Sequence, residues 1–407
     1  MSLNRPLEKI SNGAFRAAFI LLGLFLPYSI AGMNFALGLA ALAWALWIID
    51  RRGARLRPDA LALASIALAV SALPSVFLSE NISRAANDWR SYWELAICFL
   101  VGAHIARVGI REGSFWTMAI ASVGACLVAF VQRAGGVHAG FVNIGAEHRV
   151  SGTMFTMTFA GILYQFILFN GAAAVCPRFS RRRVWLGIIV ALQFVALLLT
   201  VTRGAWLALF AGAAVLCLLL RRREIIIGTA VALVALLAFS FAFSRDQGRS
   251  VAVSEIATAP ADRNVATRLV LWDISWELFR EHPVFGVGMG DYSIEADKHL
   301  RARKVRTTVD THNVFLHVLA TRGLFGFIPF VIYFVVLFRS LGGVFKRAGP
   351  ASIERYYAAG AIAALVAVLA GALTENNIDD SEVHIVLMFL VGLARSPLGR
   401  ETPRAGD

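Results

Sequence analysis

The chain has 407 residues, of which 58% are hydrophobic and 16% are charged, and its formal net charge is +13. A soluble protein carries roughly a quarter charged residues, so this composition excludes an ordinary water-soluble enzyme. The positive charge does not indicate a nucleic-acid partner, because the cytoplasmic loops of membrane proteins collect Lys and Arg.

Apolar runs of about 15–22 residues recur along the chain, and this length crosses the ~30 Å hydrocarbon layer as a helix. A bilayer requires helices, because every backbone polar group must be paired within the span. The sequence predicts an all-α, polytopic membrane protein, a single domain over 1–407 with about twelve spans. The spans are expected at 14–31, 33–49, 60–78, 92–106, 114–131, 153–171, 184–201, 203–220, 224–243, 313–337, 356–374 and 383–395.

Basic clusters follow the second, sixth, eighth and tenth predicted spans. Twelve spans place these clusters and both termini on one side, which is cytoplasmic by the positive-inside rule. The periplasmic side then holds segments 79–91, 132–152 and 244–312. Segment 244–312 is a long loop between the ninth and tenth spans, and structureless loops of this length are uncommon and usually functional. Within it, Val265–Glu281 is predicted to be an amphipathic helix with one face formed by Leu269, Trp272, Trp276 and Phe279.

Arg203 lies at the external turn between two very apolar spans, where an arginine must snorkel, pair or face water. It is either an interfacial arginine that snorkels or a clamp for an anion, because a guanidinium binds phosphate in a bidentate way. Arg268 begins a motif that ends at Trp272 on the loop helix, and on this motif alone a solvated surface arginine is the simpler interpretation.

His312 lies at the start of the tenth predicted span, where Asp310 or Thr311 is expected to cap the helix. An imidazole titrates near working pH, so it can accept a proton or orient a hydroxyl group. The alternative is an interfacial histidine without chemistry. A basic cluster that includes Arg306 precedes it, and this cluster is either a solvated face or a contact for anionic headgroups or a phosphorylated substrate.

No nucleotide-binding or metal-binding motif is present in the sequence. The run Gly286-Val287-Gly288-Met289-Gly290 lacks the dinucleotide spacing and a preceding strand, so it is predicted to be a turn. Asp379 and Asp380 could hold a cation but stand alone, and the four cysteines lack metal-ligand spacing. We therefore expect no cofactor and no metal, and a substrate that arrives through the membrane already activated.

Three motifs occur in an order that resembles one family. They are Thr202 to Trp206; Arg268 to Trp272 followed by His282-Pro283 and the glycine run; and His312-Asn313-x-x-Leu316 followed by Gly323-Leu324-x-Gly326. Together they resemble the O-antigen ligase and polymerase superfamily, in particular its ligase branch. The resemblance extends over nearly the whole chain, with its strongest motifs in 200–326.

The resemblance implies a metal-independent membrane glycosyltransferase of the C type. It implies that a glycan passes from undecaprenyl diphosphate to lipid A–core at the periplasmic face of the bacterial inner membrane, with inversion at the anomeric carbon. The family's important residues carry over as Arg203 and Arg268, which would hold the diphosphate, and His312, which would activate or orient the acceptor hydroxyl. We also expect substrate contacts from Asn313, Arg306 and Trp272.

Three other functions compete with a ligase. A polymerase of the same superfamily tends to have two sizeable periplasmic loops, whereas here 132–152 is modest beside 244–312. A protein-glycosylating ligase usually has a longer chain with an added C-terminal region. A transporter or flippase predicts charged residues at mid-membrane along several spans, whereas here the polar groups gather at one face. These comparisons favour the ligase.

Overall fold

A computed structural model describes residues 6–50, 58–135, 149–246, 263–303 and 310–396, together with residues 305 and 307. Within these residues every regular element is helical, which confirms the all-α prediction. Eight helices among them are long and apolar enough to cross a membrane, which confirms a polytopic membrane protein. The count of twelve spans stays a prediction, although each predicted span coincides with a helical segment.

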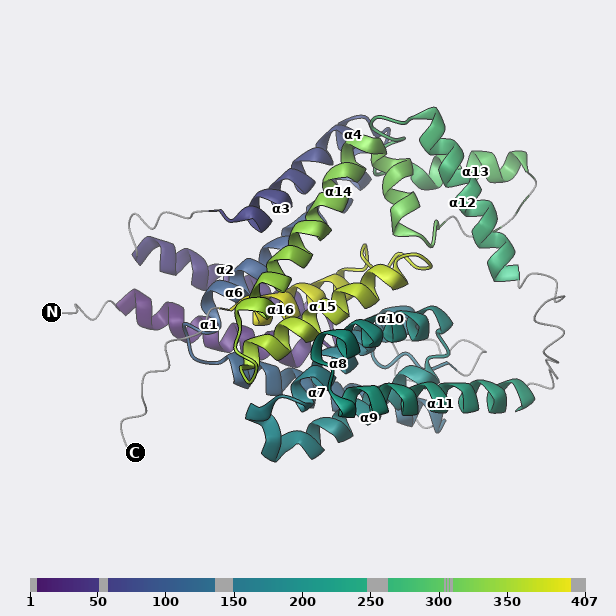
Figure 1. The fold of residues 1–407 in the computed structure, drawn as a ribbon. Helices are drawn as coiled ribbons and strands as arrows, with labels where there is room; N and C mark the ends of the chain where they lie inside the picture. The colour runs from purple at the N-terminus through teal and green to yellow at the C-terminus, as the bar shows by residue number, and fades with distance from the viewer. Residues whose placement is uncertain are drawn as a thin grey trace.

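The helices follow one another along the whole chain (Figure 1). Their bounds are α1 Pro6–Phe25, α2 Ile30–Asp50, α3 Ala60–Ser71, α4 Leu73–Phe77, α5 Ile82–Arg90, the 3₁₀ helix η1 Ser91–Ala96, α6 Ile97–His104, α7 Arg111–Arg133, α8 Thr156–Ala174, the 3₁₀ helix η2 Pro177–Arg182, α9 Arg183–Leu199, α10 Arg203–Leu220, α11 Arg223–Asp246, α12 Arg263–Glu281, α13 Tyr292–Ala302, α14 Val314–Arg347, α15 Ile353–Gly371 and α16 Ser381–Arg395.

Helices α8, α15 and α16 form the centre of the bundle, and most of their residues are buried. Small residues let them approach closely, as is usual for helices in a bilayer. A Cβ on Gly360 of α15 would lie 3.0 Å from the Cα of Phe169 in α8, and one on Gly212 of α10 would lie 2.6 Å from the carbonyl oxygen of Ala363 in α15. The outer helices α2, α9 and α11 instead expose large apolar side chains, as helices that face lipid must.

The two ends of the bundle differ in what they carry. One end, called the site face below, carries the turn 200–202, the segment 310–313 and the loop 372–380. It is the end that the sequence predicts to be periplasmic. The opposite end carries ion pairs between helix starts, such as Arg183 to Glu224 at 3.3 Å, beside the predicted cytoplasmic basic clusters.

Helices α12 and α13 form a small unit on the site face, called the lid below and comprising residues 263–303 (Figure 1). It has a core separate from that of the bundle, made by Leu271, Ile274, Leu278, Tyr292, Ala296, Leu300 and Ala320. The prediction of a helix over Val265–Glu281 is confirmed. Its packing face is formed by Leu271, Ile274 and Leu278, whereas Leu269 and Trp276 of the predicted apolar face are exposed. Because α12 carries apolar residues on both faces, periodicity alone could not choose between them.

Helix α14 is long and apolar enough for the span predicted at 313–337, but it is broken at Gly323, which the prediction did not include. The φ angle of Gly323 is +57°, a left-handed conformation that glycine adopts at little cost. The part before the break turns back toward the loop between α15 and α16 (Figure 1), and the backbone N–H of Val314 donates to the carbonyl of Ala372 at 2.9 Å. The part after the break continues to Arg347, ten residues beyond the predicted end.

The chain between α12 and α13 pairs with the polar groups that this break releases. The N–H groups of Val287 and Gly288 donate to the carbonyls of Ala320 and Thr321, at 2.9 and 3.1 Å. In the other direction, the N–H groups of Leu324 and Phe325 donate to the carbonyls of Pro283 and Val284, at 2.9 and 3.0 Å. Backbone groups left unpaired at a helix break are costly in an apolar setting, so this exchange stabilises both the break and the lid.

Gly286 shows why the glycine run is needed here. Its φ angle is +70°, and a Cβ on it would lie 2.2 Å from the carbonyl carbon of Thr321. That neighbour is backbone and cannot rotate away. The predicted turn at the glycine run therefore serves as a close backbone contact between the lid and the break in α14.

We expect Gly286→Ala to destabilise the purified protein in detergent. The left-handed backbone alone costs an alanine about 1–2 kcal/mol, and the overlap with Thr321 adds to this. The measurement is the midpoint of thermal unfolding, compared with Gly342→Ala in α14, where a Cβ meets nothing within 4 Å. Equal midpoints for the two variants would contradict the proposed contact.

Candidate active site at the site face

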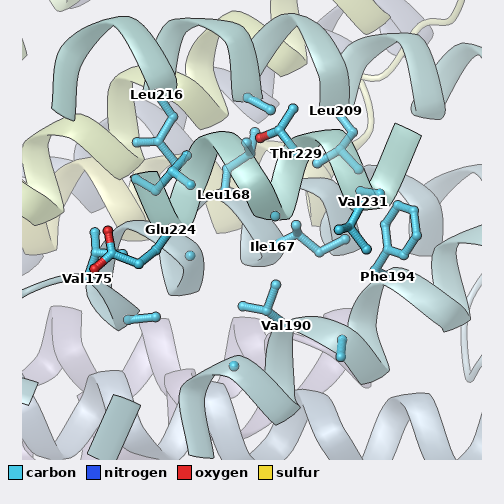
Figure 2. Close-up of a pocket in the computed structure, with 18 of the residues that line it drawn as sticks. Ile167, Leu168, Val175, Val190, Phe194, Leu209, Leu216, Glu224, Thr229 and Val231 are labelled. Carbon is cyan, nitrogen blue, oxygen red and sulfur yellow. The ribbon is translucent and has the colours of Figure 1, made fainter. Parts of the chain in front are cut away.

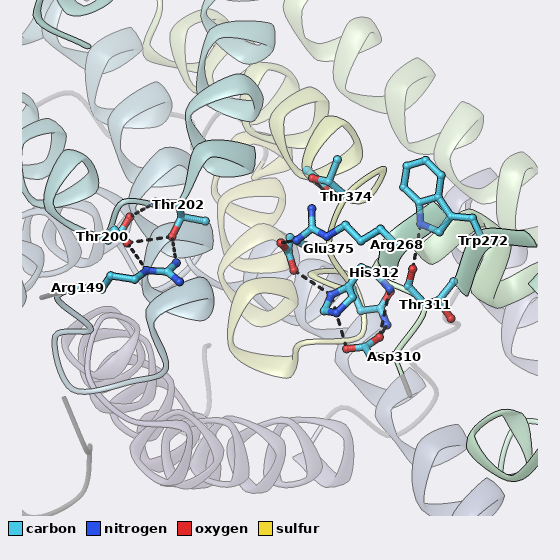
Figure 3. Close-up of polar contacts among 12 residues, drawn as sticks. Arg149, Thr200, Thr202, Arg268, Trp272, Asp310, Thr311, His312, Thr374 and Glu375 are labelled. Atoms are coloured by element: carbon cyan, nitrogen blue, oxygen red, sulfur yellow. Dashed lines mark hydrogen bonds and ion pairs between the residues drawn. The ribbon is translucent and has the colours of Figure 1, made fainter. Parts of the chain in front are cut away.

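The turn before α10 is held by an arginine from a distant segment. Arg149 donates from Nε to the carbonyl of Thr200 at 2.9 Å and from Nη2 to Oγ1 of Thr202 at 3.0 Å (Figure 3). Between these residues Val201 has a φ of +51°, which is unusual for a β-branched residue. Such strained residues persist only where their surroundings hold them, and they cluster at functional sites. The turn fixes the start of α10, whose first residue is Arg203.

Arg268 extends from the lid to the loop between α15 and α16. Its Nη2 donates to Oε1 of Glu375 at 2.6 Å, and both side chains are largely shielded from solvent. This ion pair connects the lid to the end of α15. The structure thus shows Arg268 in a specific contact rather than on a solvated surface.

His312 lies on the other side of the same carboxylate. Its Nδ1 is 3.4 Å from Oε2 of Glu375 and 3.9 Å from Oδ2 of Asp310 (Figure 3). The φ angle of His312 is +48°, so this residue also has a left-handed backbone. Its backbone N–H donates to Oδ1 of Asp310 at 3.3 Å, and the amide of Asn376 donates to the same oxygen. The unusual backbone aims the imidazole at Glu375.

The contact with Glu375 raises the pKa of His312 above its ordinary value of 6.5, although burial opposes this shift. Asp310 adds to the increase, and the charge of Arg268 acts against it. With Nδ1 facing the carboxylate, Nε2 is the ring nitrogen left for a substrate. A histidine oriented by a carboxylate is a common form of general base.

Asn313 caps α14, so the prediction that Asp310 or Thr311 caps this helix is wrong. The Oδ1 of Asn313 accepts from the N–H groups of Phe315 and Leu316, at 3.1 and 3.2 Å. The helix begins at Val314, and Asn313 is therefore the residue placed to accept from its first turn. Its side-chain oxygen is occupied by the cap, which leaves its amide nitrogen for the predicted substrate contact.

Trp272 holds the segment before His312. Its indole Nε1–H donates to the carbonyl of Thr311 at 3.0 Å. Arg268 and Trp272 are one helical turn apart on α12, so this helix contacts both Glu375 and the 310–313 segment. Arg306, also predicted to contact substrate, lies outside the described residues.

A cavity of about 180 Å³ lies between His312 and the start of α10. Its lining comes from α8, α10, the 310–312 segment and the 371–380 loop: Met157, Gly161, Tyr164, Thr202, Gly204, Ala205, Asp310, His312, Gly371, Glu375, Asn376, Asn377 and Asp380. The neighbours of Arg203 thus line the same cavity as His312, whereas Arg203 is exposed and is not among the lining residues. Thr202 makes no side-chain cap, so the first N–H groups of α10 can bind an anion.

A second, apolar cavity of about 440 Å³ lies between α8, α9, α10 and α11 (Figure 2). Leu168 and Leu209 line it, each about one helical turn beyond Tyr164 and Ala205 of the smaller cavity. Helices α8 and α10 therefore line the 180 Å³ cavity near their starts and this apolar cavity about one turn further along.

Asp380 is occupied by contacts within the protein. Its Oδ2 accepts from Oγ1 of Thr158 at 2.5 Å, and its Oδ1 accepts from the N–H of Glu382 at 3.2 Å as the cap of α16. In the part of the chain that the structure describes, no group of three or more His, Cys, Asp or Glu side chains is placed to hold a metal ion. The absence of a metal requirement stays a prediction.

Sequence reasoning missed Glu375 and Arg149, which hold the predicted residues in place. Glu375 directly follows the eleventh predicted span. A carboxylate at the end of an apolar segment is a signal that could have identified it. Its two partners lie 107 and 63 positions away, so no local pattern could reveal them.

Residues 188–331 match a family model described as O-antigen ligase. The matched segment begins within α9, ends within α14 and contains Arg203, Arg268 and His312, whereas Glu375 lies beyond it. No curated protein matches the chain.

Proposed function

Because the chain belongs to the O-antigen ligase superfamily, we propose that it is an O-antigen ligase. In this proposal it transfers a glycan from undecaprenyl diphosphate to lipid A–core at the periplasmic face of the bacterial inner membrane. The observation that carries the proposal is the contact of Glu375 with both Arg268 and His312, beside a cavity that the start of α10 completes.

In the proposed reaction, a hydroxyl oxygen of the acceptor sugar attacks the anomeric carbon of the donor glycan. The bond from that carbon to the diphosphate oxygen breaks, and undecaprenyl diphosphate leaves. The hydroxyl proton moves to Nε2 of His312, and Glu375 stabilises the imidazolium that forms. A single in-line displacement of this kind inverts the configuration at the anomeric carbon.

The diphosphate gains negative charge as the bond breaks, and its stabilisation is the main requirement for catalysis. Arg268 and Arg203 are the proposed donors, assisted by the N–H groups at the start of α10. Arg268 is already oriented by Glu375, so little reorganisation is needed when the charge develops. Fixed cations of this kind can do the work for which other transferases use a divalent ion.

The apolar cavity between α8 and α11 supports a polyprenyl donor (Figure 2). A diphosphate at the start of α10 would place the attached chain along α8 and α10, where this cavity begins about one turn further on. An isoprenoid tail needs such an apolar surface, because every CH₂ group removed from water contributes about 0.8 kcal/mol.

A deletion strain tests the choice of reaction. We expect the polymer ladder to disappear from lipid A–core while the glycan is retained on the lipid carrier, and complementation to restore it. A single repeat unit on lipid A–core would instead indicate a polymerase.

Transfer by the purified protein should persist in EDTA, and a loss of activity that Mg²⁺ restores would contradict the metal-independent mechanism.

We expect Glu375→Gln to move the pH–rate profile to lower pH. His312 must be neutral to accept a proton, so the rate should rise as pH increases through its pKa. The contact with Glu375 raises that pKa, and removal of the carboxylate charge should lower it. The measurement is the initial rate of transfer between pH 5 and 9 by the purified protein, a window around the ordinary pKa of histidine, about 6.5.

Glu295→Gln is the matched control, because Glu295 lies on α13 and pairs with Lys298 at 2.6 Å, away from His312. Its profile should coincide with that of the parent protein. An unchanged profile for Glu375→Gln would show that Glu375 does not set the titration of the base.

A further inference from the structure

A third cavity, of about 590 Å³, opens beside the smaller one on the site face. Its lining comes mainly from the start of α2, from α5 and η1, from residues 289–293, from α14 before its break, and from the 376–381 loop. Asp310 and Asn376 line both cavities, and their side chains are hydrogen-bonded to each other. This larger cavity therefore lies directly across the Asp310–Asn376 pair from His312.

Arg322 lines this larger cavity and is the buried arginine among its lining residues. It is the last residue before the break in α14, and only 8% of it is exposed. Its Nη1 donates to the hydroxyl of Tyr92, whose ring also lies under the guanidinium at 5.5 Å. The buried Nε has no hydrogen-bond partner, and among the described residues no carboxylate forms an ion pair with this side chain. The charge of Asp88 acts on Arg322 without forming an ion pair with it. A buried cation that lacks an ion-pair partner is costly, so Arg322 is placed for an anion that enters the cavity.

Two further guanidinium groups, those of Arg84 and Arg90 on α5, also line the cavity. The Nη1 of Arg84 donates to Oγ of Ser293 at 2.8 Å, so it connects α5 to the lid. Both side chains are exposed. Of the three arginines that line the cavity, Arg322 alone is buried.

The carboxylates of the cavity divide into two pairs. Glu94 is engaged by His384 at 2.8 Å, and Asp310 is engaged by Asn376. Asp88 and Asp379 are left to accept from hydroxyl groups. The side chain of Asp88 is exposed at the cavity surface, where a ligand hydroxyl can reach it. Carboxylates and asparagine amides together can accept hydrogen bonds from, and donate them to, the hydroxyl groups of a sugar. A neutral sugar would leave Arg322 without an ion-pair partner.

We propose that this cavity binds an acidic sugar of the acceptor, one that carries a phosphate or a carboxylate, with Arg322 as its counter-charge. The proposal rests on the proposed function, because it places the acceptor next to the base that activates it. The donor is assigned to the other side of the Asp310–Asn376 pair, where the start of α10 and the apolar cavity lie. The two substrates would thus meet at His312 from opposite sides.

Calorimetric binding tests the proposal without any transfer reaction. The probe is the oligosaccharide obtained by complete deacylation of lipid A–core, offered to the purified full-length protein in detergent. It is used intact, after removal of phosphate and after reduction of its carboxyl groups. We expect Arg322→Gln to weaken binding of the intact probe roughly ten- to a hundredfold, as for a hydrogen bond to a charged group.

The neutralised probes identify the anion. One of the two modified probes lacks the group that Arg322 recognises. The affinity of the parent protein for this probe should be as low as the affinity of Arg322→Gln for the intact probe. The Arg322→Gln substitution should not weaken binding of this probe any further. Arg84→Gln should cause a smaller loss; because Arg84 is exposed, this variant tests the proposal even where Arg322→Gln fails to fold. Arg301→Gln, at an exposed position of α13 outside the lining, is the matched control and should bind normally.

The proposal is overturned where the parent protein does not bind the intact probe, or binds all three probes equally, or where Arg322→Gln and Arg84→Gln bind like the parent. Glycan transfer by a protein that fails these tests would leave the ligase function standing and remove only the acidic-sugar site. If the protein binds the probe through Arg322 but transfers no glycan, the acidic-sugar site stands and the ligase function is overturned.

Discussion

Purified protein carrying His312→Ala is expected to lose glycan transfer by about 10²–10⁴-fold, the usual contribution of a positioned general base. His312 is the imidazole that lines the small cavity, and its Nδ1 is 3.4 Å from the Glu375 carboxylate. Without it, the acceptor hydroxyl loses the proposed base. The measurement is the rate of transfer from lipid-linked donor to lipid A–core in detergent.

The backbone at this position requires a second variant. Because the φ angle of His312 is +48°, an alanine there is strained for reasons unrelated to proton transfer. Asparagine tolerates this conformation well, and its amide is not a base, so His312→Asn should fold normally and still be inactive. His282→Ala, an exposed histidine of the lid, should retain full activity. Near-normal transfer by folded His312→Ala protein would rule out the proposed role.

Arg268→Ala is expected to lower the transfer rate by about 10²–10³-fold, as for the removal of one preorganised donor from a developing anion. Arg268→Lys should restore only part of this loss, because an ammonium group lacks the planar fork that binds diphosphate and Glu375 together. Arg280→Ala is the matched control, since Arg280 lies at the far end of the same helix and contacts Trp276.

The pH dependence separates this role from a purely structural one. The charge of Arg268 lowers the pKa of His312, so its removal should move the rise in rate to higher pH, opposite to the effect of Glu375→Gln. The double variant of Arg268 and Glu375 should be less impaired than the product of the single losses, because the two groups are in contact. If the losses of rate in the two single variants multiply in the double variant, and the pH–rate profile of Arg268→Ala does not shift, Glu375 does not couple Arg268 to His312.

The sequence was sufficient for the membrane architecture, because the length of an apolar run and the requirement for paired backbone groups act locally. It also singled out Arg268 and His312 as candidates, and the structure brings these two residues to the same carboxylate. It could not show that one carboxylate joins them. Glu375 lies outside these motifs, and only the fold brings the end of α15 beneath the lid.

The break in α14 shows a different limit. A hydrophobic run predicts a straight helix, and Val314–Arg347 is apolar on both sides of Gly323. The break depends on backbone partners that come from residues 283–288, nearly forty positions earlier. Neither segment alone carries a signal for this exchange. For the same reason the binding surface around Arg322 could not be predicted from its local sequence.

Exchange of parts between related proteins is constrained by the same break. The stretch around Gly286 and the stretch around Gly323 fit each other through backbone atoms, so neither can be transplanted without its partner. A chimera that takes only the lid from a relative would join two surfaces that did not evolve together. Substrate preference in this architecture should therefore be inherited as a matched pair of segments, and boundaries for engineering belong before α12 and after the break in α14.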